Sequence, residues 1–283
     1  MDLSVIIVNY NTKELLKRCL ASVFSSKTKY SFEVLVSDNG SQDASSEMVK
    51  KEFPQVSLIE NKENLGFSKG NNIALKRAHG RYLLLLNSDT EVRPDTFERS
   101  LSYMNEHGEV GILGCKVLLP DGSLDPACRR RFPNPANSFL RLFGLKRFSD
   151  YNIGGDVDAA LEVDAVMGAY LMIRKVALDK IGFLDEEYFM YGEDLDWCWR
   201  AKFAGFKVVY YPKAQIVHYK YGSSQKTSAK IIVFSHQAMK IFYRKHYAQK
   251  NAWALNQLVY LGISLHQGLV LAKNLFRKKK AVH

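Results

Sequence analysis

The segment Tyr82-Leu83-Leu84-Leu85-Leu86-Asn87-Ser88-Asp89-Thr90 begins with apolar residues and ends with polar ones. Five large apolar residues in succession predict a strand that is buried on both faces of a sheet. Open α/β sheets bind ligands outside the carboxyl ends of their strands, which is where Asn87, Ser88 and Asp89 follow. The Asp89 carboxylate is therefore placed to hold a metal or a polar substrate. An ordinary Asx turn after a strand explains the same residues equally well.

Strand and helix patterns alternate through the first hundred residues. Apolar runs predict strands at residues 3–8, 33–37, 56–59 and 83–86. Helical spacing of apolar residues follows each run, so the chain is expected to form an α/β fold with a mainly parallel central sheet flanked by helices. In such a sheet the polar turns at residues 9–11, 38–41 and 87–89 lie at one edge and converge on one crevice.

The composition indicates a globular protein with an anionic partner. The chain has 283 residues and a net charge of +11, which suits nucleic acid, an acidic membrane surface or a phosphorylated substrate. Its four cysteines are scattered, so the sequence predicts no zinc site and no disulfide framework, and it favours a reducing, cytoplasmic location. An apolar run begins two residues after Met1, which leaves no room for a signal peptide.

No glycine-rich phosphate-binding motif occurs in the sequence, neither GxGxxG nor GxxxxGK followed by Ser or Thr. A nucleotide at the predicted crevice would therefore depend on Asp and Asn side chains and on a metal.

Three carboxylates lie among aromatic residues in the segment Phe189-Met190-Tyr191-Gly192-Glu193-Asp194-Leu195-Asp196-Trp197. Helical spacing continues beyond it, so the acids fall in a first helical turn, where the helix dipole favours negative charge. The dipole explains one or two acids, but it does not explain the adjoining aromatic surface. Carboxylates beside aromatic walls are typical of a general base that acts on a sugar. Upstream, Gly168 and Ala169 are small enough to let a ligand approach the backbone.

Two further features have both a structural and a functional interpretation. Three adjacent arginines, Arg129 to Arg131, lie in a Pro-, Asp- and Gly-rich segment at residues 121–137, which is expected to be a mobile loop. They suit a solvated surface, and contact with a phosphate is the alternative. His218 ends an apolar run, and a lone histidine is more often structural than a ligand.

The C-terminal tail, residues 226–283, differs from the rest of the chain. Residues 231–247 predict a basic amphipathic helix, and residues 251–272 contain no Lys, Arg, Asp or Glu. This second stretch has too many polar groups for a comfortable membrane-spanning helix. One face is apolar, with Leu258, Leu261, Leu265, Leu269, Ala272 and Phe276 at helical spacing. The opposite face carries Asn256, Tyr260, Ser264, Gln267 and Asn274.

A basic cluster, Arg277-Lys278-Lys279-Lys280, follows this second helix. The pattern predicts a helix in a membrane interface with a polybasic anchor. A helix packed on the protein's own core is the alternative.

Taken in order, the polar segments resemble a family-2 glycosyltransferase of the GT-A fold, with bacterial rhamnosyltransferase-like members most similar. The resemblance covers roughly residues 1–225. It rests on Val-Asn-Tyr-Asn at 8–11, Ser-Asp-Asn-Gly-Ser at 37–41, Asn-Leu-Gly-Phe at 64–67, Leu-Asn-Ser-Asp-Thr at 86–90, Met-Tyr-Gly-Glu-Asp-Leu-Asp at 190–196, and His218 near Gly222 and Ser224. It implies a nucleotide-sugar-binding half at residues 1–107 and an acceptor-binding half at residues 108–225.

The resemblance also implies roles for single residues. Tyr10 and Asp38 would hold the nucleotide base, and Asp194, beside Glu193, would be the catalytic base. Asp89 would bind a divalent metal, Mg²⁺ or Mn²⁺, with His218 completing the metal shell. The implied donor site comprises Val8, Tyr10, Asp38, Gly66, Asn72, Asn87, Ser88 and Asp89, and the implied acceptor site comprises Gly168, Ala169, Glu193, Asp196 and Trp197.

One departure from the family pattern concerns the metal. The family's DxD motif begins here with Asn87, so Asp89 is its one carboxylate and substrate phosphates would supply further ligands. A histidine ligand would favour Mn²⁺ over Mg²⁺.

The expected function is therefore an inverting glycosyltransferase, with a nucleotide-diphospho-sugar donor and a glycan or lipid-linked acceptor. The expected location is the cytoplasm, with peripheral binding at the inner face of the cell membrane through the tail. A catalytically silent nucleotide-sugar-binding protein is one alternative. A nucleic-acid-binding protein is suggested by charge alone and lacks an aromatic stacking platform, so no nucleic-acid partner is expected.

Overall fold

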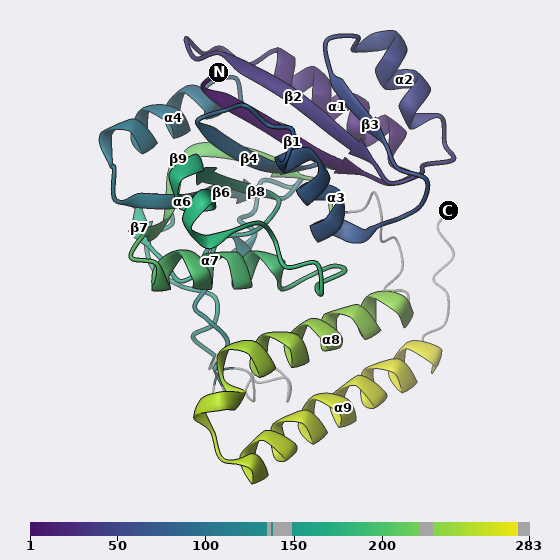
Figure 1. Ribbon diagram of the computed structural model, residues 1–283, viewed down its shortest axis with the longest axis vertical. Helices are drawn as coiled ribbons and strands as arrows, with labels where there is room; N and C mark the ends of the chain where they lie inside the picture. Colours follow the sequence, from purple (N-terminus) through teal and green to yellow (C-terminus); the bar gives the residue numbers. More distant parts are fainter. Residues whose placement is uncertain (135–136, 138–148, 221–228, 277–283) are drawn as a thin grey trace.

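The computed structural model describes residues 1–134, 137, 149–220 and 229–276. These residues form one mixed sheet with helices packed around it and a pair of long C-terminal helices beside it (Figure 1). The strands are β1 (Leu3–Asn9), β2 (Phe32–Asp38), β3 (Ser57–Glu60), β4 (Tyr82–Asn87), β5 (Thr90–Val92), β6 (Val110–Leu118), β7 (Leu161–Glu162), β8 (Tyr170–Arg174) and β9 (Lys207–His218). The α-helices are α1 (Lys13–Phe24), α2 (Ser45–Glu52), α3 (Gly66–Leu75), α4 (Thr96–Glu106), α6 (Lys175–Ile181), α7 (Glu193–Phe203), α8 (Ala229–His246) and α9 (Trp253–Phe276), with short 3-10 turns at Pro126–Cys128 and Ala248–Lys250.

The strand order β3-β2-β1-β4-β8-β6-β9-β5 confirms the α/β fold with a mainly parallel central sheet. Strands β3, β2, β1 and β4 are all parallel, as the alternation of strands and helices predicts. The register pairs Asn9 with Asp38 and Val8 with Asn87. The polar turns after β1, β2 and β4 therefore lie at one edge of the sheet, which is where a ligand site is expected.

Strand β4 lies inside the sheet and is deeply buried. It is flanked by β1 on one side and by the antiparallel strand β8 on the other. Its residues Tyr82 to Leu86 are at most 2% exposed. Cover on both faces explains the unbroken apolar run in the sequence.

The apolar run that His218 ends belongs to one long strand, β9. Strand β9 pairs along its length with β6, and the register shifts where Cys115 faces Tyr211 and Lys116 faces Gln215. The residues between them bulge out of the ladder, and they include Pro212, which has no N–H to donate. The break in the sequence pattern marks this bulge rather than a loop between two strands.

The arginine segment also differs from the prediction. Arg129 and Arg130 are 2% and 8% exposed, so the expectation of a solvated surface is wrong for both. The Arg129 guanidinium donates hydrogen bonds to the carbonyls of Gly155 and Asp156. Arg131 is exposed and pairs with Asp150. Residues 135–136 of the predicted mobile loop lie outside the described residues.

Helices α8 and α9 pack against each other, and α9 lies on the far side of α8 from the sheet (Figure 1). Among the described residues no helix has both the length and the apolar character needed to cross a membrane. The proposed boundary between residues 225 and 226, the residues Gly222 and Ser224, and the basic cluster at residues 277–280 lie outside the described residues.

Candidate active site

The first part of the site is formed by the turns after β1 and β2. The Asp38 carboxylate accepts hydrogen bonds from Asn9 Nδ2 (2.8 Å), Ser41 Oγ (2.6 Å) and the Ser41 backbone N–H (2.8 Å). Its side chain is almost fully buried, whereas neighbouring Tyr10 is 43% exposed. The predicted base-binding pair is thus a fixed carboxylate beside a free aromatic ring, and Val8 is half-buried behind them.

The turn after β4 is tied to the turn after β1. Thr12 Oγ1 donates to Asn9 Oδ1 at 2.6 Å and lies 3.0 Å from Ser88 Oγ. Asn87 Oδ1 is buried and has no hydrogen-bond partner among the described residues. A buried polar atom without a partner is rare in a folded protein and is typical of a ligand-binding site.

Asp89 and His218 lie next to each other at the same edge. Strand β5 pairs with β9 so that Thr90 is opposite His218, which places the imidazole beside the preceding residue. His218 Nε2 is 3.1 Å from Asp89 Oδ1, and both side chains are buried. Within the described ranges no group of three or more His, Cys, Asp or Glu side chains is arranged as a metal site.

Asp194 lies in the first turn of α7, held by three hydrogen bonds. Arg130 Nη2 donates to its Oδ2 at 2.7 Å, the Gly168 backbone N–H donates to the same atom at 3.1 Å, and the Leu195 N–H donates to Oδ1 at 2.8 Å. Both members of the Arg130–Asp194 ion pair are buried. A buried charge needs such partners, because an unpaired one would be strongly destabilising.

Glu193, the preceding residue, has the opposite character. Burial and the charge of Asp194 raise the pKa of Glu193 to about 8. Its Oε2 atom has no hydrogen-bond partner in the described part of the chain. The structure therefore places a protonated glutamic acid beside an aspartate that is paired with arginine. Two carboxyl groups whose environments differ in this way are a common arrangement in active sites.

Tyr191 joins the Asp89 region to the Glu193 region. Burial, together with the charges of Glu193 and Asp89, raises the pKa of the Tyr191 phenol. Its backbone lies in the left-handed region, with φ at 71°, which is uncommon for a bulky residue. Backbone strain of this kind often occurs at functional sites. The Gly168 N–H binds Asp194, and the carbonyl of the next residue, Ala169, accepts from the Asn87 N–H, so the two carboxylate regions are neighbours.

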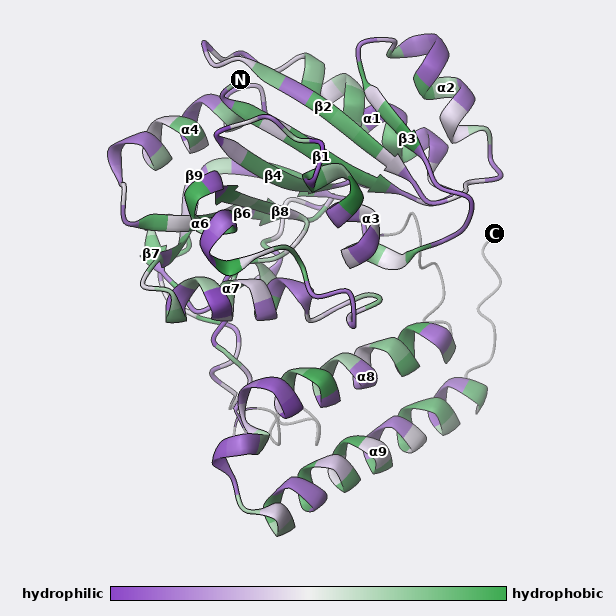
Figure 2. Cartoon of the chain, viewed as in Figure 1, coloured by the Kyte–Doolittle hydropathy of each residue, from purple (hydrophilic) through white to green (hydrophobic). Residues whose placement is uncertain are grey.

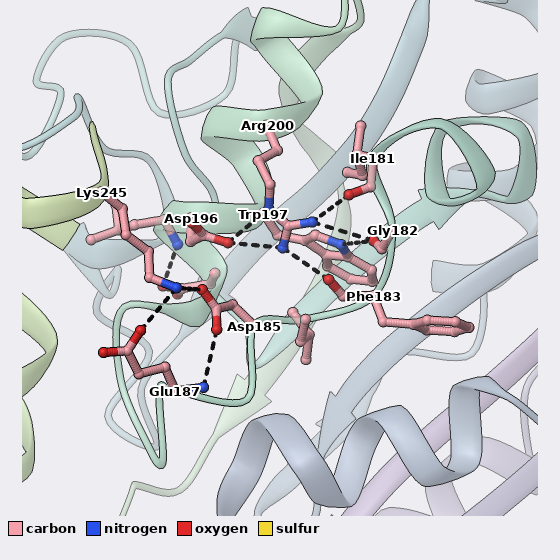
Figure 3. A network of polar contacts seen from close by, with 12 residues as sticks. Ile181, Gly182, Phe183, Asp185, Glu187, Asp196, Trp197, Arg200 and Lys245 are labelled. Atoms are coloured by element: carbon pink, nitrogen blue, oxygen red, sulfur yellow. Dashed lines mark hydrogen bonds and ion pairs between the residues drawn. The ribbon is translucent and has the colours of Figure 1, made fainter. Parts of the chain in front are cut away.

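Two of the predicted acceptor residues are instead structural. The Trp197 side chain is fully buried, and its indole N–H donates to the Gly182 carbonyl (Figure 3). Asp196 is bound by Arg200 Nε at 2.8 Å and by His246 Nε2 at 2.8 Å. These contacts leave neither side chain free to meet an acceptor. They hold α7 against the segment before it and against α8.

Three other predicted site residues also act mainly in packing. Asn72 binds the backbone of Leu184 through both ends of its amide and is buried. Gly66 has φ at 80°, and a Cβ there would lie 2.5 Å from the Phe189 carbonyl oxygen, so the close approach requires glycine. The Ala169 side chain is buried, and its carbonyl accepts from the Asn87 N–H.

Gly168 differs from these residues, because its N–H contacts Asp194 directly. It is therefore part of the immediate surroundings of the Asp194 carboxylate.

The sequence interpretation missed two contributors to the site. Arg130 was considered only as a surface or phosphate contact, and no site role was expected for Thr12. The sequence did mark Arg130 as one of three arginines in a polar segment, but its partner lies 64 residues away. Thr12 lies 76 residues from its neighbour Ser88.

Comparison with known proteins identifies the family of the chain. Glycosyl transferase family 2 matches residues 4–182. The chain belongs to this family. The matched residues include the turns after β1, β2 and β4, whereas Asp194 and His218 lie beyond them. The prediction that the chain is a family-2 glycosyltransferase is confirmed.

Curated relatives of this family-2 glycosyltransferase are similar over most of its length. An N-acetylglucosaminyl-diphospho-decaprenol L-rhamnosyltransferase of Mycobacterium tuberculosis is 27% identical over 265 residues, which cover 85% of this chain and 83% of the relative. The low-salt glycan biosynthesis hexosyltransferase Agl10 of Haloferax volcanii is 24% identical over 98% of this chain and 86% of the relative. Rhamnosyltransferase WbbL of Escherichia coli is 23% identical over 80% of this chain and 86% of the relative.

Solved structures confirm the GT-A fold. GalNAc-T7 with UDP, GalNAc and Mn²⁺ has a TM-score of 0.63 at 16% identity, covering 86% of this chain and 47% of that protein. The mannosyltransferase PcManGT from Pyrobaculum calidifontis, in complex with GDP-Man and Mn²⁺, has a TM-score of 0.61 at 16% identity, covering 95% and 75%.

Proposed function

We propose that this family-2 enzyme is an inverting glycosyltransferase that moves a sugar from a nucleotide-diphospho-sugar to a hydroxyl of a glycan or lipid-linked acceptor in cell-surface polysaccharide synthesis. One observation carries the proposal. The Asp194 carboxylate and the Asp89–His218 pair lie close to one segment, since Gly168 donates to Asp194 and the next residue, Ala169, accepts from Asn87 at the end of β4. This arrangement separates a base for the acceptor from a site for the donor phosphates.

The donor nucleotide lies across the turns after β1 and β2. The exposed Tyr10 ring stacks on the base, and Asp38 accepts a hydrogen bond from a base N–H. Ser41 and Asn9 already fix the Asp38 carboxylate, so the contact needs little reorganisation. Asn87 Oδ1 has no partner in the described residues, and it accepts a hydrogen bond from a hydroxyl of the nucleotide-sugar.

Asp89 and His218 would hold the divalent metal. A carboxylate oxygen and an imidazole nitrogen lie 3.1 Å apart there, and this ligand pair would suit Mn²⁺. Donor phosphates and water would supply the remaining ligands. When bound, the metal supplies positive charge against the leaving diphosphate.

Asp194 takes the proton of the acceptor hydroxyl. The acceptor oxygen forms its bond to the anomeric carbon, the bond from that carbon to phosphate oxygen breaks, and the nucleoside diphosphate leaves with the electron pair. Arg130 and the Gly168 N–H orient the base, and protonated Glu193 beside it donates a hydrogen bond to a sugar oxygen. A base in this position contributes about 100- to 10,000-fold to the rate.

The relatives support rhamnose as the sugar. The Mycobacterium tuberculosis and Escherichia coli relatives are named rhamnosyltransferases, so dTDP-rhamnose is the first donor to test and a UDP-hexose the second. The name of the Mycobacterium tuberculosis relative also includes a lipid-linked N-acetylglucosaminyl diphosphate. An acceptor of that chemistry is therefore the first to try.

The test is a panel of dTDP-, UDP- and GDP-sugars with an N-acetylglucosaminyl-diphospho-lipid, following released nucleotide with and without Mn²⁺. We expect one donor to support Mn²⁺-dependent release, and Asp89→Ala to abolish it. The matched control is Asp95→Ala, which removes an exposed carboxylate from the same segment. Donor binding without release for every acceptor would favour the silent binding protein, and full activity of Asp89→Ala would refute the metal assignment.

A further inference from the structure

Helix α9 presents its apolar face outward. Leu258, Leu261, Leu265 and Leu269, here called the leucine stripe, are 65%, 54%, 61% and 61% exposed. They recur at steps of three and four residues and therefore share one side of the helix. Exposed leucines are unremarkable singly, but a continuous row along a helix marks an interaction surface.

The polar side of α9 is the one that packs on α8. Asn256 Oδ1 accepts a hydrogen bond from the Tyr243 hydroxyl at 2.8 Å, and His266 Nδ1 lies 2.9 Å from His236 Nε2. Ile263 is the one residue of α9 buried at this contact in the described chain. These bonds fix the rotation of α9 about its axis. Helix α9 therefore packs on the rest of the protein, as the sequence alternative expects, but its leucines do not take part in that packing.

The stripe lies on the outermost element of the protein. Figure 2 shows hydrophobic residues along the whole of α9, with α8 between this helix and the sheet. The helix has 24 residues, or about 36 Å at 1.5 Å per residue. Trp253, which is 76% exposed, stands at its first residue, and the exposed Lys273 lies in its last turn. Trp and Lys at the ends of an apolar face are typical of a helix that lies in a membrane interface.

The charge of the protein is concentrated in this same region. Residues 226–283 contain 11 of the 40 lysines and arginines and none of the 29 aspartates and glutamates. The remaining 29 basic and 29 acidic residues, all within residues 1–225, cancel. The whole net charge of +11 therefore belongs to the tail, which carries the leucine stripe. A basic segment beside an apolar face is attracted to anionic lipid.

The charge also argues against a second copy of the chain as the occupant of the stripe. Two tails meeting face to face would bring together segments that are both basic and contain no acid to pair with. Like charges in contact are repulsive and disfavour such a dimer. An anionic surface has the complementary sign.

We propose that the leucine stripe docks the protein, with α9 parallel to the surface, on an anionic lipid membrane. The four leucines enter the boundary between headgroups and acyl chains, and the exposed Lys273 in the last turn of α9 contacts the lipid headgroups. This inference is independent of the proposed function, because neither the stripe nor the tail charge involves the active site.

The test measures binding of the full chain to vesicles of phosphatidylglycerol and phosphatidylcholine, compared with vesicles of phosphatidylcholine alone. We expect binding to the anionic vesicles and much weaker binding to the neutral ones. Raising the salt to about 0.5 M, which shortens the screening length to about 4 Å, should weaken it. The double variant Leu261→Gln/Leu265→Gln should bind at least ~30-fold more weakly, because two apolar side chains no longer leave water.

Val176→Gln is the matched control, since Val176 is also an exposed apolar side chain, at 65%, but lies on α6. It should bind vesicles like the wild type, and all variants should keep the wild-type melting temperature, because the changed side chains are exposed. Wild-type vesicle binding by the double variant would overturn the proposal, as would equal binding to neutral vesicles. A wild-type dimer that the double variant dissociates, with no vesicle binding by either, would assign the stripe to a second copy instead.

Discussion

Strand β4 and helix α9 are both rich in leucine, yet the leucines of β4 are buried and those of the leucine stripe are exposed. Leu83 to Leu86 are at most 2% exposed, whereas the leucines of the stripe are more than half exposed. Strand β4 has a neighbouring strand on each side and cover on both faces, so every side chain is enclosed. Within the described part of the chain, helix α9 packs mainly on α8, which binds its polar face. An amphipathic pattern therefore predicts two faces but not which of them is inside.

The same contrast holds for polar groups. The sheet edge encloses Asp38, Asp89 and Asp194, each with hydrogen-bond partners, while α9 leaves its apolar residues in solvent. Buried charge and exposed leucine are both unfavourable in a protein that only has to fold. Each therefore indicates a binding surface, and the predictions that follow test the two surfaces separately.

The largest effect is expected at the buried carboxylate of the active site. Asp194→Asn removes the base but keeps the shape of the side chain, so turnover should fall by at least ~100-fold while donor affinity stays near the wild-type value. Steady-state kinetics and donor titration measure the two quantities. Asp179→Asn, at an exposed carboxylate on α6, is the control and should leave both unchanged.

If Asp194→Asn loses donor binding and turnover together, the role of Asp194 is structural. The melting temperature helps to interpret that result, since the variant also leaves Arg130 without its partner in a buried position.

The second prediction compares a buried leucine of β4 with an exposed leucine of the leucine stripe. Leu84→Ala should lower the free energy of unfolding by about 2–5 kcal/mol, because it leaves a cavity in the enclosed core. Leu265→Ala should change it by less than about 0.5 kcal/mol, because its side chain is 61% exposed. Urea denaturation of both variants measures the difference. Similar losses at the two positions would mean that the stripe is covered in solution.

The smallest effect concerns the pH dependence of stability at Glu193. Its pKa rises from 4.5 to about 8 on folding, so between these values the folded protein holds a proton that the unfolded chain has released. Stability therefore falls as pH rises through this window. Glu193→Gln removes this contribution.

The Glu193 prediction is checked by urea denaturation between about pH 5 and pH 8, which gives the difference in unfolding free energy between the wild type and Glu193→Gln. The variant should gain stability relative to the wild type as the pH increases. Parallel profiles would show that Glu193 is already ionised in the folded protein.

The fold was predictable because its signals are local. The apolar run of β4 and the helical spacing after each strand are visible in short windows, and the sheet follows from their alternation. The polar turns after β1, β2 and β4 were predictable for the same reason, since each ends a strand and the parallel register brings them together.

The remaining parts of the site depend on contacts between distant residues. Arg130 meets Asp194 across 64 residues, and no local pattern distinguishes it from exposed Arg131. Trp197 looked like a sugar-stacking residue because aromatic side chains serve both in cores and in sugar sites. Its burial is decided by the packing of α7 against the chain around Gly182. The orientation of α9 was likewise set by partners on another helix, Tyr243 and His236.

The hydrogen bonds of Asp196 also bear on the distance between the active site and helix α9. Asp196 lies two residues after Asp194 on α7, and it binds His246 of α8, whose ring lies against Trp199. Lys245 adds ion pairs to Asp185 and Glu187 in the segment just before α7 (Figure 3). Helix α8 in turn packs against α9, so a series of contacts links Asp194 to the leucine stripe. With α9 seated on lipid, these contacts would hold Asp194 at a set height above the bilayer. The enzyme would then select acceptors by how far the reactive hydroxyl projects from the membrane, as well as by the sugar that bears it.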